Sequence, residues 1–78
     1  MIQMKYVRAN MFDFYIFPKH ISHSAFCDRN GIRLDNITSA GFITIDNDNV
    51  HFYGEALSVN KNANPKEDME MFNRYKYI

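Results

Sequence analysis

The sequence contains a single cysteine, no tryptophan, three glycines, two prolines and no excess of charge of either sign. One cysteine excludes a disulfide within the chain, so the fold depends on its packed core. Nine Lys and Arg residues balance nine Asp and Glu residues, which argues against broad electrostatic capture of nucleic acid. No hydrophobic run approaches the about 18 residues of a membrane span, and the N-terminus lacks a signal peptide's apolar stretch. We therefore expect a cytoplasmic protein.

The apolar content of the chain is sufficient for one small domain covering residues 1–78. Hydrophobic residues make up 46% of the sequence, and the chain's large rings come from its seven phenylalanines and five tyrosines. A chain of this length buries only about 60% of the surface that its unfolded form exposes, so the margin of stability is thin. Residues 60–64 are the one linker-like stretch, and they are too short to divide two domains.

Two runs near the N-terminus alternate between apolar and polar residues, as half-buried strands do. Asn10 lies between these runs and can adopt the positive φ of a hairpin turn. Pro18 ends the second run because it has no N–H to donate to a neighbouring strand. Ser22 can cap a short helix, and Gly31 suits the end of that helix. The apolar residues expected to share a face are Ile2, Met4 and Tyr6 in the first run and Phe12, Phe14 and Ile16 in the second.

The second half of the chain repeats the order strand, strand, helix. Residues 42–45 and 50–53 are rich in β-branched and aromatic side chains, and residues 46–49 form the turn between them. Gly54 suggests a bulge, after which Leu57 and Val59 are expected to extend the strand.

The last helix has the clearest start signal in the sequence. Asn64 is the expected N-cap, Pro65 takes the first helical position, and Glu67 follows three residues after the cap. Met69 and Phe72 are expected to face the core, with Tyr75 beside them. The sequence therefore predicts an α+β fold: a four-stranded antiparallel sheet with two helices on one face, in the order ββαββα.

The sheet face opposite the helices is more apolar than a solvated face should be. Two explanations are open: register or a bulge turns some of these residues inward, or a second molecule covers the face, most simply another copy of the chain. The second explanation predicts a homodimer. The residues expected in such a dimer interface, or in contact with another partner, are Tyr15, Phe17, Phe42 and Tyr53.

Candidate catalytic and metal-binding residues are few. On a continuous helix His20, His23 and Cys27 would share one side and could bind zinc, with His51 as a fourth ligand. Pro18 and Ser22 suggest instead that the helix starts after His20, which would separate the ligands. His23 and Cys27 could also form a nucleophilic pair, but the sequence offers no oxyanion site. We therefore expect no enzyme, no metal and no cofactor.

Basic and aromatic residues are interleaved at the C-terminus, where rings could stack on bases. A cationic helix end is the simpler explanation, because such charges favour the negative end of the helix dipole. Binding of nucleic acid is thus an alternative function. The residues that would carry it are Lys61, Lys66, Arg74 and Lys76.

Several segments resemble a family of small uncharacterised proteins from bacteriophages, prophages and other mobile elements. They are FPKHISH at 17–23, SAGF at 39–42, YGEALSV at 53–59 and PKED at 65–68. Ala56 and Val59 depart from the family pattern, which has Ser and Leu at these positions. The resemblance implies a biological setting in phages or mobile elements, but it implies no chemical activity for this chain.

Small proteins of phages are often accessory factors that bind a host protein, and inhibitors of bacterial immunity, including anti-CRISPR proteins, share this size range. The resemblance therefore implies a non-enzymatic protein of the bacterial host cytoplasm that binds a host protein and inhibits a defence complex. This expectation follows from size and setting, since fold or size alone does not determine function.

Overall fold

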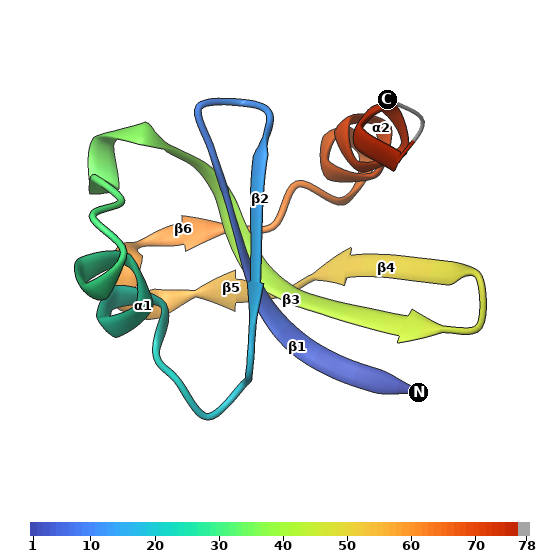
Figure 1. The fold of residues 1–78 in the computed structure, drawn as a ribbon, viewed down its shortest axis with the longest axis horizontal. Helices are drawn as coiled ribbons and strands as arrows, with labels where there is room; N and C mark the ends of the chain where they lie inside the picture. The colour runs from blue at the N-terminus through green and yellow to red at the C-terminus, as the bar shows by residue number, and fades with distance from the viewer. Residues whose placement is uncertain (77–78) are drawn as a thin grey trace.

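The structure, a computed structural model, describes the backbone of residues 1–76 and the side chains of residues 1–74. Four strands form an antiparallel sheet in the order β2-β1-β3-β4: β1 (Ile2–Ala9), β2 (Asp13–Phe17), β3 (Ile37–Asp46) and β4 (Asn49–Tyr53). A small second sheet, β5 (Glu55–Ala56) and β6 (Lys61–Asn62), packs against β3. The helices α1 (His23–Arg29) and α2 (Pro65–Lys76) complete the order ββαββα (Figure 1). The predicted α+β class with a four-stranded antiparallel sheet is confirmed.

Helix α1 begins and ends where the sequence predicts. The Ser22 hydroxyl accepts a hydrogen bond from the Ala25 backbone N–H at 3.1 Å, and Gly31 adopts a φ of 67° after the helix. Cys27 faces the core while Arg29 is exposed. A 3-10 turn, η1 (Leu34–Asn36), then leads into β3. Within residues 1–76, neither helix has the length and hydrophobicity needed to cross a membrane.

The two helices lie on opposite faces of the sheet, which differs from the expected placement on one face. Neighbouring residues of a strand point to opposite faces. Tyr6 belongs to the core cluster that contains Phe72 of α2, whereas Val7 belongs to the cluster that contains Cys27 of α1. Figure 1 accordingly shows α1 and α2 on different sides of the strongly twisted sheet. The apolar second face of the sheet is thus partly explained, because α1 covers it.

The segment after Gly54 forms a turn where the sequence predicted a longer strand. Gly54 has a φ of 83°, and β5 ends after two residues. Leu57 and Val59 form a 3-10 turn, η2 (Leu57–Val59), so the expectation that they extend the strand is wrong. Asn60 ends the turn with a φ of 54°, a conformation that Asn tolerates better than most residues, and this reverses the chain so that β6 can pair with β5. The turn buries Val59 and exposes Leu57.

Candidate functional site

A fully buried arginine on β1 is the centre of a polar network inside the protein. The Arg8 guanidinium donates from Nε to Asp68 Oδ1 at 2.7 Å and to the Ser39 hydroxyl at 3.2 Å. Its Nη1 donates to the backbone carbonyl of Met11 at 2.7 Å, and its Nη2 bonds the carboxylate of Glu67. One side chain therefore joins β1, β3, α2 and the turn that follows β1.

Asp68 is the fully buried partner that compensates this charge. Its carboxylate also accepts hydrogen bonds from the hydroxyls of Tyr6 and Ser39 and, at 3.0 Å, from the backbone N–H of Asn64. Burial acts to lower the pKa of Arg8, but the bonds to Glu67 and Asp68 outweigh burial and raise that pKa. The guanidinium is therefore charged at every physiological pH, and the ion pair docks α2 onto the sheet.

Sequence reasoning missed this network, although one signal was present. Arg8 occupies the same face of β1 as Met4 and Tyr6, so the alternation already placed it with the core residues. Its buried position indicated a need for a carboxylate partner, because an unpaired charge is rarely buried. The partner, Asp68, is 60 residues away in the sequence. Near the start of a helix, such an acidic residue is also explained by the helix dipole alone.

The turn between β1 and β2 has an unusual backbone conformation. Asn10 and Met11 both have positive φ angles, 53° and 70°. Asn tolerates this region well, but for a residue such as Met it costs about 1–2 kcal/mol. Three hydrogen bonds hold the turn: Asn10 N–H to the Asn36 carbonyl at 2.9 Å, Met11 N–H to the Thr38 hydroxyl at 3.2 Å, and Arg8 to the Met11 carbonyl. Hydrogen bonds to both the N–H and the carbonyl of Met11 therefore hold its backbone in an unfavourable conformation.

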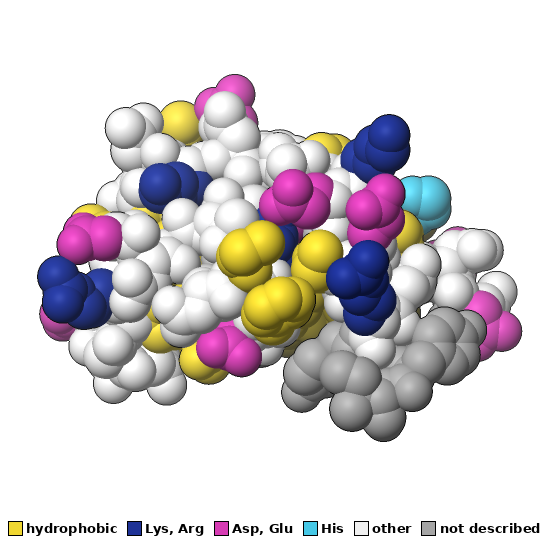
Figure 2. All heavy atoms as spheres, turned by 90° about the horizontal axis from the view of Figure 1, so that it is seen from above, with side chains coloured by type: hydrophobic (Ala, Val, Ile, Leu, Met, Phe, Trp, Pro, Cys, Tyr) yellow, Lys and Arg dark blue, Asp and Glu magenta, His cyan; other side chains and the backbone are white. Residues whose placement is uncertain are grey.

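This turn presents apolar side chains to solvent. Met11 is 51% exposed and Phe12 is 58% exposed. Figure 2 views the end of the molecule where the turn and α2 lie, and shows hydrophobic side chains gathered near the middle of that face with acidic and basic side chains around them. The Arg8 guanidinium donates to both the Met11 carbonyl and the Glu67 carboxylate, so this carboxylate lies close to the turn. We refer to Met11 and Phe12 as the turn patch.

The residues predicted for a dimer or partner interface lie together on the α1 face of the sheet. Neighbouring rings in this row have centroids 4.0–6.3 Å apart. Phe17 is buried and stacks on Phe26 of α1, so this structure does not present Phe17 to a partner. Contact of the half-buried members with a partner stays a prediction. The row runs in the order Tyr15, Phe26, Phe17, His23, Phe42 and Tyr53.

The residues predicted for nucleic-acid contact do not form a uniformly basic surface. Lys61 is half-buried on β6, and Arg74 is exposed on α2. Lys66 lines a shallow hollow with Glu67 and Glu70, whose negative charges oppose its attraction for phosphate. The fourth residue of this prediction, Lys76, has a side chain outside the described residues.

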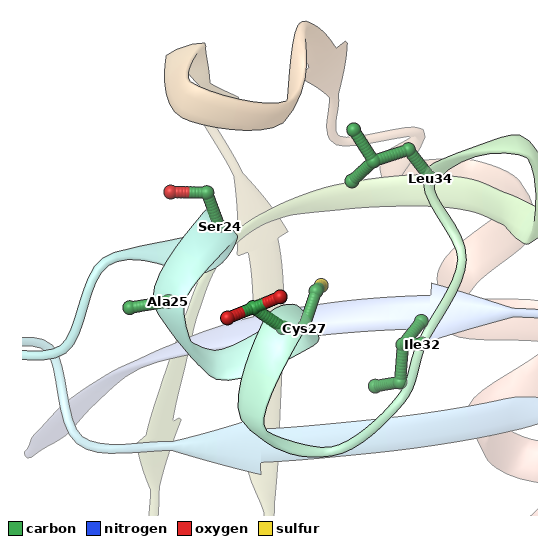
Figure 3. Close-up of a pocket in the computed structure, with 6 residues that line it drawn as sticks. Ser24, Ala25, Cys27, Ile32 and Leu34 are labelled. Carbon is green, nitrogen blue, oxygen red and sulfur yellow. The ribbon is translucent and has the colours of Figure 1, made fainter.

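The residues considered for metal or nucleophilic chemistry are separated. His20 is exposed in the turn before α1, whereas His23 is buried and donates from Nε2 to the Gly41 carbonyl at 2.8 Å. Cys27 lines a different cavity, of about 440 Å³, between α1 and Leu34 (Figure 3). Burial raises the pKa of the Cys27 thiol, which keeps it protonated and weakly nucleophilic. No group of three or more His, Cys, Asp or Glu residues in the described part of the chain could hold a metal ion.

The segments that carry the family resemblance contact one another. His23 of the first segment bonds Gly41 of the second, and a Cβ atom at Gly41 would lie 2.6 Å from the backbone carbonyl of Tyr53 in the third. A Cβ atom at Gly54 would in turn lie 3.0 Å from the Phe42 ring, so both glycines permit close packing. Much of each segment therefore has a scaffold role.

Comparison of the chain with protein-family models, curated proteins and solved structures gives no match. The function must therefore be argued from the residues of this chain.

Proposed function

We propose that this protein is a non-enzymatic accessory factor that binds another protein through the turn patch. The observation that carries the proposal is the fixed, strained turn that exposes Met11 and Phe12. Backbone conformations of this kind are kept where the surrounding structure holds them, and they occur often at sites of function. A stable hairpin would more simply have Gly at the second position of positive φ.

The turn patch has the physical properties of a binding surface. Large apolar and aromatic residues supply much of the energy of protein interfaces, and a few central residues dominate it. Because Met11 is held through both its N–H and its carbonyl, little backbone freedom is lost on binding. Asp13 follows Phe12 directly, and Glu67 lies close to the turn, which favours a partner surface with basic groups around an apolar pocket.

The biological setting is part of the proposal and comes from the family resemblance. We propose that the partner is a protein of a bacterial host and that binding inhibits a defence complex, in the manner of anti-CRISPR proteins. A second copy of the chain remains part of this proposal, with the exposed portions of Tyr15, Phe42 and Tyr53 as its contact residues.

Affinity capture from bacterial lysate tests the proposal when matched variants are included. Wild type should recover a partner that survives nuclease treatment, and Phe12→Ser should lose that partner. Ile2→Ser is the matched control, because Ile2 is exposed to the same degree, 57%, at the other end of β1. Equal recovery by wild type and Phe12→Ser would refute a role for the turn patch. Recovery that nuclease abolishes would favour the alternative, nucleic-acid binding by Lys61, Lys66, Arg74 and Lys76.

A further inference from the structure

A second small cavity lies on the α1 side of the sheet, away from the turn patch. It has a volume of about 250 Å³ and is lined by Lys5 of β1, His23 of α1, Phe42 of β3, and Glu55, Leu57 and Ser58 of β5 and η2. All of these residues except Lys5 belong to segments that carry the family resemblance. Packing explains the burial of His23, and Ser58 accepts a hydrogen bond from the Ser24 backbone N–H at 3.1 Å, but the fold does not explain Glu55 and Leu57, which are exposed.

The cavity brings together one cation and one anion that are not paired. The Lys5 ammonium donates one hydrogen bond, to the Ile21 carbonyl at 2.9 Å. Neither Lys5 nor Glu55 takes part in an ion pair within the described part of the chain. Two opposite charges on the wall of one small cavity suit a ligand that carries both complementary charges.

The histidine in the wall does not add a further charge. His23 Nε2 must carry a proton, because the carbonyl of Gly41 can only accept. Burial lowers the pKa of His23, and the charge of Lys5 acts in the same direction. The imidazole is therefore neutral at pH 7, and the Lys5 ammonium is the positive charge available to a ligand in this cavity.

Phe42 and Leu57 supply the apolar part of the wall, and Ser22 and Ser58 line it with hydroxyl groups. Phe42 is half-buried, whereas Leu57 is 81% exposed. An exposed leucine gains about 25 cal/mol for each Å² of apolar surface that a ligand covers. The cavity is smaller than the about 300–1,000 Å³ of sites for drug-sized ligands, so its ligand must be small.

We propose that this cavity binds a zwitterionic ligand of the size of one amino acid with an apolar side chain. The ligand carboxylate contacts Lys5, its ammonium contacts Glu55, and its side chain lies between Phe42 and Leu57. This site is independent of the turn patch, so it stands or falls separately from the proposed function.

Titration of the ¹⁵N-labelled full chain with L-leucine, followed by NMR, tests this site. Saturable shifts are expected at the amides of Lys5, His23, Phe42 and Glu55 at millimolar ligand. Lys5→Met keeps the aliphatic stem and Glu55→Gln keeps the shape, and each should weaken binding about tenfold by removing one charge-assisted contact. His51→Gln, an exposed change on β4 outside the cavity, should leave the affinity unchanged.

Two truncated probes check the charge requirement. 4-Methylpentanoate lacks the ammonium group and isopentylamine lacks the carboxylate, so each should bind more weakly than L-leucine. Absence of saturable shifts, or equal affinity of all three compounds, would overturn the proposal. Phe12→Ser should bind L-leucine like wild type, which distinguishes failure of this site from failure of the turn patch.

Discussion

Replacing Asp68 by Asn should destabilise the protein more than any change at an exposed ion pair. The carboxylate is fully buried and accepts hydrogen bonds from Arg8, Tyr6, Ser39 and Asn64. The amide retains the shape but not the charge, so the Arg8 guanidinium stays buried with only Glu67 to compensate it. Removal of one partner from a buried ion pair costs about 3–5 kcal/mol. A domain of this size has about 4–12 kcal/mol of stability in total, so the loss is a large share.

Urea unfolding followed by far-UV circular dichroism measures this effect as a lower transition midpoint. Arg33→Gln is the control: it breaks the exposed pair with Asp35, N to O 3.1 Å, and should change little. The double variant Arg8→Met, Asp68→Leu should recover part of the loss, because it leaves no unpaired buried charge. A cost below about 1 kcal/mol for Asp68→Asn would refute the reasoning, since exposed pairs contribute that little.

Other predictions concern pH, the turn and the ring row. The pKa of His23 is lowered from its usual 6.5 in the folded state, so the unfolded chain binds more protons below that pH. The unfolding free energy measured in urea titrations should therefore fall as the pH is lowered through 6.5, and His23→Gln should remove this fall while His51→Gln should not. Met11→Gly should raise the unfolding free energy by up to about 1 kcal/mol, because glycine tolerates positive φ; a decrease would contradict the strain at this turn. Phe17→Asp should abolish cooperative unfolding because Phe17 is buried, whereas Tyr53→Asp should stay folded. If a second copy covers the row, light scattering should show Tyr53→Asp at 9.2 kDa and wild type at twice that mass, and wild type at 9.2 kDa would exclude the dimer.

Local signals predicted the elements of the fold well, because alternation and helix caps act over a few residues. The Ser22 cap, the Gly31 helix end and the positive φ of Asn10 are all confirmed. The placement of the helices was not predictable in the same way, since it depends on which face of the sheet each helix covers. Val7 and Phe17 make the second face of the sheet apolar, and α1 covers that face.

The candidate site was less predictable than the fold. Glu67 follows three residues after the expected cap, Asn64, but its carboxylate bonds Arg8, and Asp68 accepts from the backbone N–H of Asn64. Both partners of the buried pair are residues that usually lie at the surface, so their types gave no indication of burial. Met11 gave no local signal of a positive φ either, because the residues that accept from the turn, Asn36 and Thr38, are far from it in the sequence.

The Arg8 guanidinium bonds both α2 and the carbonyl of Met11, and this couples two parts of the molecule. When α2 detaches, Arg8 loses its carboxylate partners, and α2 no longer orients the guanidinium that makes one of the three hydrogen bonds holding the turn. A partner that holds the turn must therefore slow hydrogen exchange in α2, although it touches no residue in the interior of that helix. Conversely, proteolytic release of α2 would loosen the turn patch while leaving its own sequence intact.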